Sequence, residues 1–133
     1  MKTKTIGIVG SRRRNNPRDY KVVRNKLLSL ILSEGLDFKK VTLISGGCPE
    51  GADKFAEKIA RDYGMKIKIH YPDKSKIVTG QRWEWTKINY ERNTLIARDS
   101  DTLIACVASD RKGGTEDTIK KYQALGKTEL ILV

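Results

Sequence analysis

The sequence predicts an α/β fold in three layers (α/β/α), with helices on both faces of a five-stranded, mainly parallel sheet. Two observations predict this class. Short β-branched or apolar runs alternate with amphipathic helical segments, and the alternation runs from Lys4 to Val133 without a repeat or a linker. The chain has 133 residues, the length of one domain, so we expect a single domain over residues 1–133.

The first two segments are a strand and a helix. The run KTIGIVG, residues 4–10, is short and β-branched, and it ends at a glycine. Asn16 followed by Pro17 suits an N-cap and the first position of a helix. Apolar residues then recur at helical spacing until Gly35 closes the segment, namely Val23, Leu27, Leu30 and Ile31.

A second strand and helix follow, and then a third strand. The run VTLIS, residues 41–45, is the strand, and an apolar stripe from Ala52 to Tyr63 predicts a helix that Gly64 stops. Residues 66–71, KIKIHY, alternate between polar and apolar side chains. This alternation is typical of a strand at the edge of a sheet or covered on one face only.

The remaining segments complete the alternation. Residues 72–81 are polar, and we expect them to form a loop over the functional site. Helices are predicted from about Trp83 to Arg98 and from Thr115 to Leu125. The run TLIACVA, residues 102–108, is apolar throughout, as in a strand buried on both faces, and ELILV, residues 129–133, supplies the last strand.

The composition indicates a basic protein without a disulfide framework or a metal cluster. Two cysteines are too few for either, and no apolar stretch approaches the length of a membrane span, so we expect a cytoplasmic protein. Residues 1–26 contain nine Lys or Arg and a single acid, Asp19, so they carry most of the formal net charge of +11. Two interpretations are open: a basic, soluble surface, or attraction to phosphate on a small ligand or a nucleic acid.

Three strand-to-helix turns form the candidate binding site. They are GSRRRNN after the first strand, SGGCPEGAD after the second and ASDRKGGTEDT after the fourth. In a parallel sheet such turns meet at the carboxyl ends of the strands, where ligands bind. Each combines glycine with Ser or Thr and leads into a helix, whose first N–H groups and dipole favour an anion. Three such turns on one edge predict a phosphate-binding site.

Two common nucleotide-binding motifs are absent from the sequence. It contains no G-x-x-x-x-G-K-[ST], which disfavours a Walker-type NTPase. Its first turn is not G-x-G-x-x-G, which disfavours an ordinary dinucleotide dehydrogenase. The phosphate must therefore be held in another way.

Four segments together resemble the SLOG superfamily of Rossmann-like proteins, namely GIVGSR, ISGGCPEGADKFAEKIA, YERNTLIARDSDTLIA and KGGTEDTIKKYQALGK. The superfamily includes DprA, the LOG phosphoribohydrolases and many small single-domain proteins. The sequence is most similar to the small DUF2493, YspA-like branch, over Ile6 to Val133. The resemblance implies a homodimer with a pocket for a nucleotide or a nucleotide-derived ligand, including one related to ADP-ribose.

The resemblance also implies which residues line this pocket. They are Gly10, Ser11 and Arg12 in the first turn, Ser45, Gly46, Gly47, Gly51 and Asp53 in the second, Arg92 and Asn93 on the third helix, and Gly113, Gly114 and Thr115 in the last turn. From the residues alone, Asp53 could bond a ribose hydroxyl or simply stabilise the first turn of a helix. Arg92 lies on an otherwise apolar helix face and needs an anionic partner, either a ligand phosphate or Asp101.

A phosphoribohydrolase is the first alternative to a binding or sensing protein. LOG enzymes share a P-G-G-x-G-T-x-x-E motif, whose glutamate works with an arginine of the preceding helix to cleave the N-glycosidic bond. Here Arg92 fits the arginine position, but Thr118 stands where the glutamate would be. The reaction needs a carboxylate to activate water or to stabilise an oxocarbenium-like centre. Arg92 and Glu116 are therefore the candidate catalytic residues, but Glu116, or Asp117 in its place, could substitute for the glutamate only if the start of the helix were rotated. We favour binding or sensing over hydrolysis.

A nucleic-acid-binding protein is the second alternative, because the arginine-rich first turn, Arg12 to Arg14, could contact a polynucleotide backbone, as the DprA likeness also suggests. No cofactor is required by any motif, and no residue cluster demands a metal, although Mg²⁺ could accompany a phosphorylated ligand.

Several single residues have both a functional and a structural interpretation. Cys48 sits at a helix entrance, which lowers a thiol pKa, but His70, the only histidine, is not an evident catalytic partner. Trp83, Trp85 and Tyr90 could stack on a base or pack against protein.

Overall fold

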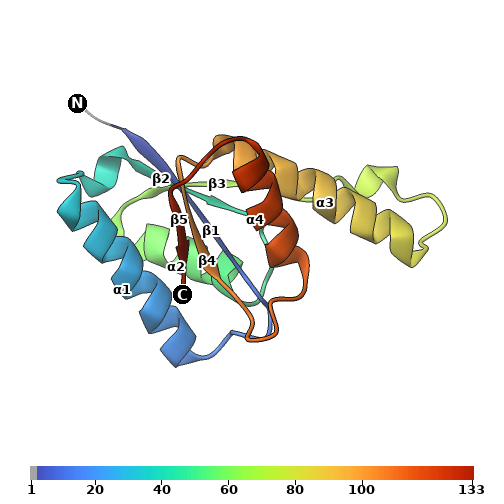
Figure 1. Ribbon diagram of the computed structural model, residues 1–133, viewed down its shortest axis with the longest axis horizontal. Coiled ribbons are helices and arrows are strands. Elements are labelled where there is room, and N and C mark those ends of the chain that lie inside the picture. Colours follow the sequence, from blue (N-terminus) through green and yellow to red (C-terminus); the bar gives the residue numbers. More distant parts are fainter. Residues whose placement is uncertain (1–2) are drawn as a thin grey trace.

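The structure is a computed structural model that describes residues 3–133, and it has the predicted α/β architecture (Figure 1). Single turns of 3-10 helix, η1 (Phe38–Lys40) and η2 (Lys74–Lys76), precede β2 and α3. The main elements follow in the order β1 (Lys4–Gly10), α1 (Pro17–Ser33), β2 (Val41–Ser45), α2 (Ala52–Tyr63), β3 (Lys66–Ile69), α3 (Arg82–Asp99), β4 (Thr102–Cys106), α4 (Gly114–Ala124) and β5 (Leu130–Leu132).

The sheet is parallel throughout, with the strand order β3-β2-β1-β4-β5. β3 lies at an edge, as its alternating sequence predicts, and every residue of β4 is buried, as its apolar run predicts. The order reverses at β1, because β2 pairs with one side of β1 and β4 with the other. Such a switch point opens a crevice at the carboxyl ends of the two central strands.

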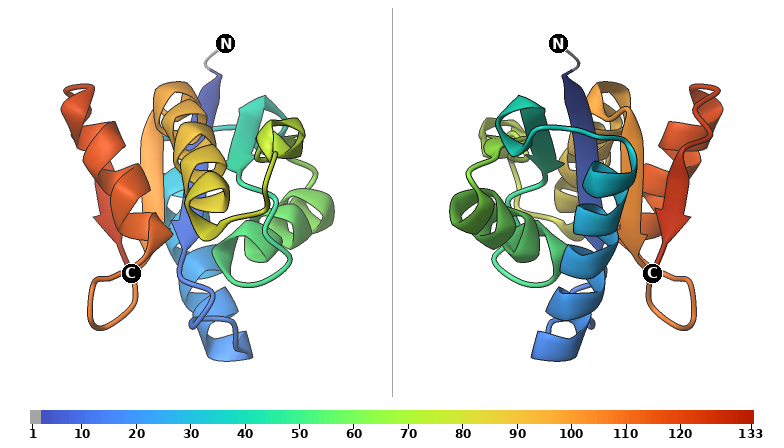
Figure 2. Two further views of the ribbon diagram at one scale, coloured as in Figure 1. Left: turned by 90° about the vertical axis from the view of Figure 1, so that its right-hand side faces the viewer. Right: turned by 90° about the vertical axis from the view of Figure 1, so that its left-hand side faces the viewer.

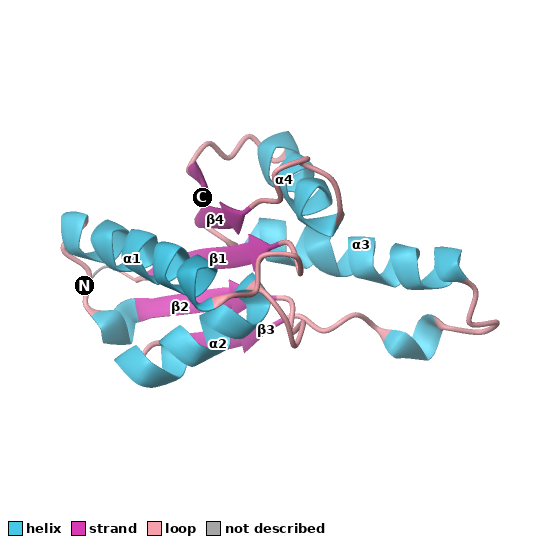
Figure 3. Ribbon diagram, turned by 90° about the horizontal axis from the view of Figure 1, so that it is seen from below, coloured by secondary structure: helices cyan, strands magenta, loops and turns pink. Residues whose placement is uncertain are grey.

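The helices form a layer on each face of the sheet (Figures 2 and 3). α1 and α2 pack on one face, where Leu27 and Ile59 belong to a buried cluster with Ile6 and Leu43 of the strands. α3 and α4 pack on the other face, where the buried cluster consists of Val9, Ile44, Ile96, Ala97, Leu103, Ala105, Ile119 and Tyr122. Within residues 3–133, no helix is both long and apolar enough to cross a membrane.

The start of α1 confirms the predicted cap and gives one arginine a structural role. The Asn16 side chain accepts a hydrogen bond from the Asp19 N–H (2.8 Å), and the Asp19 carboxylate accepts one from the Asn16 N–H (3.4 Å). This reciprocal pair satisfies two of the N–H groups that a helix start leaves free. Arg14 donates to Asp19 (3.0 Å) and to the carbonyls of Val107 and Val133. Arg14 therefore ties the first turn to the C-terminal end of the chain.

The polar segment 72–81 does not lie over the carboxyl edge of the sheet, so that prediction was wrong. Figure 1 shows α3 extending beyond the sheet, with this segment at its far end. The carboxylate of Glu84, in the first turn of α3, accepts hydrogen bonds from the N–H groups of Val78 (2.7 Å), Thr79 (2.9 Å) and Gln81 (3.1 Å). The segment therefore folds back onto the start of its own helix.

Replacing Glu84 with glutamine is expected to loosen this segment in a pH-dependent way. The hydrogen bonds from Thr79 and Val78 lower the pKa of Glu84 to about 2. A carboxylate with a lowered pKa stabilises the fold above its unfolded pKa of 4.5, and the contribution is lost as the pH falls towards 2. Hydrogen exchange at the Val78 and Thr79 amides should be faster in Glu84→Gln than in the wild type at pH 7. Thermal unfolding should show a stability difference that shrinks below pH 4.5; an unchanged difference at pH 3 would contradict this account.

Candidate functional site

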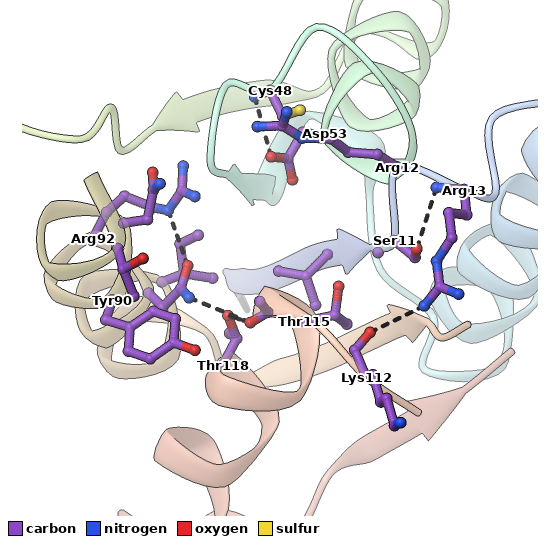
Figure 4. Close-up of a pocket in the computed structure, with 18 residues that line it drawn as sticks. Ser11, Arg12, Arg13, Cys48, Asp53, Tyr90, Arg92, Lys112, Thr115 and Thr118 are labelled. Atoms are coloured by element: carbon purple, nitrogen blue, oxygen red, sulfur yellow. Dashed lines mark hydrogen bonds between the residues drawn. The ribbon is translucent and has the colours of Figure 1, made fainter. Parts of the chain in front are cut away.

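A cavity of about 550 Å³ lies at the switch point, between the first turn, α2, α3 and the start of α4 (Figure 4). It opens at the carboxyl ends of β1 and β4, whose partners Gly10 and Cys106 are the last residues in register. The structure brings together nine of the predicted residues as lining of this cavity: Gly10, Ser11, Arg12, Asp53, Arg92, Asn93, Gly113, Gly114 and Thr115.

The other predicted residues of the second turn do not line the cavity, because the protein uses their polar groups itself. The Gly47 N–H donates to the Ser45 hydroxyl (3.2 Å), and the Gly51 N–H donates to the Asn15 side chain (2.7 Å). A β-carbon on Gly46 would lie 2.6 Å from a guanidinium nitrogen of Arg92. The second turn therefore supports Arg92 and the start of α2, and it offers no free amide at Gly47 or Gly51.

Arg92 reaches the cavity from the middle of α3. Its guanidinium donates to the Gly46 carbonyl (2.5 Å) and to the side-chain oxygen of Asn93 (2.9 Å). The expected alternative partner Asp101 instead accepts from the backbone of Thr5 (3.1 Å). Burial lowers the pKa of Arg92, and the nearby charge of Asp53 opposes that effect. An arginine stays charged even so, which leaves a cation in the cavity wall.

Arg12 places a second guanidinium in the same cavity. Among the residues that the structure describes, 3–133, no side chain or carbonyl forms a hydrogen bond or an ion pair with the Arg12 guanidinium. Its charge also contributes to the lowered pKa of Arg92, after the larger effect of burial. Two like charges that line one cavity repel each other, so an anion bound between them is favoured.

Asn93 positions its neighbours and has little capacity left for a ligand. It is buried, and its amide nitrogen donates to the Gly114 carbonyl (3.3 Å) and to Asp117 (3.1 Å). Its oxygen accepts from Arg92 (2.9 Å). Asn93 thus fixes both the orientation of Arg92 and the position of the first turn of α4.

The start of α4 supplies free backbone donors. Gly113 is the N-cap, with φ of +119°, and it has no side chain with which to cap the helix. Among the hydrogen bonds of residues 3–133, none uses the N–H of Gly114 or Thr115 as donor. The first N–H groups of a helix, together with the helix dipole, favour an anion. This is the part of the predicted phosphate site that the geometry supports most directly.

Asp53 is the only acidic side chain among the described residues that line the cavity. It lies in the first turn of α2, and its Oδ2 accepts a hydrogen bond from the Cys48 N–H (3.1 Å). Burial raises the pKa of Asp53, while the Cys48 amide and the charge of Arg92 oppose the rise. The cavity therefore combines several cations with one held carboxylate.

Glu116, the candidate catalytic carboxylate, is not brought to the cavity. It forms two hydrogen bonds of 2.8 Å with Arg111, while Thr118 lines the cavity instead. Side chains that are two residues apart on an α-helix point in roughly opposite directions, about 200° apart. The helix would have to rotate to bring Glu116 inward. Asp117 does not replace it, because Asp117 is held by Lys121 (2.7 Å) and Asn93.

Two lining residues on α3, Thr86 and Asn89, and one bridge at the rim were not predicted from the sequence. Thr86 and Asn89 share a helix face with the predicted Asn93 and with Tyr90, and all four line the cavity. Their helical spacing is the signal that could have found them. At the rim Arg13 bonds Asp110 (2.9 and 2.7 Å) and so joins the first turn to the last. The other lining residues not predicted as ligand contacts are Val9, Cys48, Ile96, Lys112 and Thr118.

The two tryptophans and the histidine lie outside this cavity. Trp83 is 60 % exposed and Trp85 is 41 % exposed, both near the projecting start of α3. His70 pairs with Asp99 (2.7 Å) at the end of β3, where it serves the packing of α3. Of the aromatic candidates, Tyr90 alone lines the cavity among the described residues.

Comparison with known proteins shows the fold. No family model and no curated protein matches the sequence. DNA processing protein A (DprA) from Streptococcus pneumoniae is similar over 98 % of this chain, with a TM-score of 0.71 and 16 % identity. The structural-genomics target TM1055 is similar over 95 % of this chain and 71 % of its own, with a TM-score of 0.59 and 18 % identity.

The present chain spans 50 % of the length of the DprA chain. Because the sequence identities are only 16 % and 18 %, the similarity shows a shared fold only. The DUF2493 branch stays a prediction. The chain has a Rossmann-like fold similar to that of DprA, and its membership of the SLOG superfamily stays a prediction as well.

Proposed function

We propose that this protein binds a phosphorylated nucleoside derivative in the cavity at the switch point, as a binding or sensing protein. The observation that supports the proposal is the meeting of free backbone donors at the start of α4 with the guanidinium groups of Arg12 and Arg92. A volume of about 550 Å³ falls within the range of small-molecule sites, roughly 300–1,000 Å³.

Binding is favoured over hydrolysis because this chain has no carboxylate at the position where a LOG enzyme has its catalytic glutamate. Thr118 occupies the inward position, and Glu116 is paired with Arg111 outside the cavity. A hydroxyl neither activates water nor stabilises an oxocarbenium-like centre as a carboxylate does. Chromatography of incubated mixtures would test this point, since release of a free base would show hydrolysis.

Nucleic-acid binding has weaker support. DprA is named a DNA processing protein, but in the present chain Arg13 and Arg14 are engaged by Asp110 and Asp19. A salt titration distinguishes the two functions, because binding of a polynucleotide weakens steeply with salt. We also propose that the protein is a homodimer, that it is cytoplasmic and that a Mg²⁺ ion accompanies the phosphorylated ligand.

The direct test is a thermal-shift screen with AMP, ADP, NAD, ADP-ribose and cyclic nucleotides, with inorganic phosphate as the comparison. We expect at least one nucleotide to raise the midpoint of unfolding, because a ligand that binds only the folded state stabilises it. A flat response to every nucleotide at millimolar concentration would overturn the proposed function.

Replacing Thr115 with valine is expected to weaken nucleotide binding by about tenfold, with little change in stability. The substitution keeps the shape of the side chain and removes one hydroxyl donor beside the free N–H groups of α4. A hydrogen bond to a charged group contributes about 1.5–3 kcal/mol. Isothermal titration of the best nucleotide would measure the loss. Thr94→Val is the matched control, because Thr94 is exposed on α3 and bonds only the Tyr90 carbonyl; equal affinities of the two variants would exclude Thr115 from the site.

A further inference from the structure

We infer that Asp53 selects a ribose, so that the ligand class is a ribonucleotide and not a deoxyribonucleotide. The inference rests on the proposed function and assigns one part of the same cavity. Asp53 would accept hydrogen bonds from the 2′- and 3′-hydroxyl groups of the sugar. Its Oδ2 is held by the Cys48 N–H (3.1 Å), which leaves Oδ1 for the ligand.

The chemistry of a carboxylate narrows what this residue can bind. An ionised carboxylate only accepts hydrogen bonds, so its partner must be a donor. A phosphate is an acceptor and an anion, and the same residue would repel it. A sugar diol offers two neighbouring donors and no charge. The carboxylate therefore suits the sugar of a nucleotide, while the phosphate groups suit the free amides of α4 and the guanidinium groups, of which that of Arg92 also offsets the charge of Asp53.

The walls of the cavity are arranged in this way. Figure 4 shows Asp53 and Cys48 on one side and Thr115 and Thr118 on the opposite side, with open space between them. The free amides of Gly114 and Thr115 attract anions at the α4 side. A nucleotide bound there by its phosphate would present its sugar across the cavity towards α2.

Asp53 is also positioned firmly enough to discriminate. It lies in the first turn of α2, directly after Gly51 and Ala52, which are both buried. The carboxylate braces the turn through Cys48, so the side chain need not be ordered when a ligand binds. A site built to bond a hydroxyl rejects an analogue that lacks it, because the site's polar group is then left unpaired.

The expected result is a preference for ribose that depends on Asp53. The wild type should bind a nucleoside 5′-monophosphate about tenfold to a hundredfold more tightly than its 2′-deoxy or 3′-deoxy analogue, the range for one hydrogen bond to a charged group. Asp53→Asn, which removes the charge with little change of shape, should reduce that ratio towards one. Asp62→Asn is the matched control, because Asp62 lies on the same helix, is exposed and pairs with Lys58 (2.8 Å). It should leave the ratio unchanged.

A second measurement uses the wild type alone and remains decisive if Asp53→Asn does not fold. Burial raises the pKa of Asp53, so its charge is lost at a higher pH than for a free aspartate. The ratio of ribose to deoxyribose affinity should therefore fall as the pH is lowered and Asp53 gains a proton. Because both ligands carry the same phosphate, titration of the phosphate cancels from the ratio.

The possible outcomes distinguish a failure of the ribose selection by Asp53 from a failure of the proposed nucleotide binding. Equal affinity for ribose and deoxyribose ligands in the wild type would overturn the role of Asp53 and leave nucleotide binding intact. A ratio that persists in Asp53→Asn, or that does not change with pH, would assign the selection to another residue. Absence of binding by any nucleotide would overturn the proposed function itself.

Discussion

Replacing Arg92 with methionine is expected to weaken nucleotide binding by about tenfold to a hundredfold. Arg92 is held by the Gly46 carbonyl and by Asn93, so its guanidinium is already oriented in the cavity wall. A hydrogen bond to a charged group contributes about 1.5–3 kcal/mol, and methionine keeps most of the apolar stem but none of the charge. Isothermal titration with the nucleotide that gives the largest thermal shift would measure the change.

The control for Arg92→Met is Arg82→Met. Arg82 lies on the same helix, is exposed and does not line the cavity, so this variant makes the same change in net charge. If binding depended only on the overall positive charge, the two variants would weaken it equally, and the role assigned to Arg92 would be wrong. Arg92→Met also leaves the Gly46 carbonyl without its donor. Affinity is therefore the quantity to compare, after unfolding curves confirm that both variants are folded.

Replacing Gly10 with valine is expected to destabilise the fold by about 3 kcal/mol or more, the upper end of the usual cost of overpacking. A β-carbon at Gly10 would lie 2.7 Å from the Cβ of Ala52, 2.8 Å from the Cβ of Cys106 and 2.9 Å from the Cys106 carbonyl. The nearest neighbours belong to a central strand and to the first residue of α2, which cannot move without displacing the sheet or the helix.

Thermal and denaturant unfolding of Gly10→Val would measure this effect. For a domain of this size, 3 kcal/mol corresponds to a fall of roughly 10 °C in the unfolding midpoint. Gly114→Ala is the matched control, because a β-carbon there has no neighbour within 4 Å. It should change stability by no more than about 0.5 kcal/mol, as is usual for a surface substitution. Similar losses in both variants would mean that close packing at Gly10 is not the cause.

The order and the type of the elements were predictable from the sequence because they depend on local patterns. Helical spacing and strand-like runs give the alternation, and the N-cap at Asn16 acts within one turn of its helix. The edge position of β3 followed from its alternating residues, and the burial of β4 followed from its apolar run. The same rules placed the site, since turns at the carboxyl ends of parallel strands must meet at one edge.

The sequence could not show which polar groups at that edge are free to bind a ligand. Several of their partners lie far away along the chain: Asn15 takes the N–H of Gly51, and Arg92 takes the carbonyl of Gly46. The segment 72–81 was misplaced for a different reason: hydrophobic periodicity does not report the polar contacts of Glu84 with Val78 and Thr79, which direct the segment away from the sheet.

The sequence by itself thus determined the layers, the switch point and the edge of the sheet at which the strand-to-helix turns meet. Only the tertiary structure decided that the start of α4, Arg12, Arg92 and Asp53 face one cavity, while the glycines of the second turn are used within the protein. The physical reason is that periodicity and capping depend on neighbours within a few residues. Whether a buried or half-buried polar group is free depends on every group packed around it.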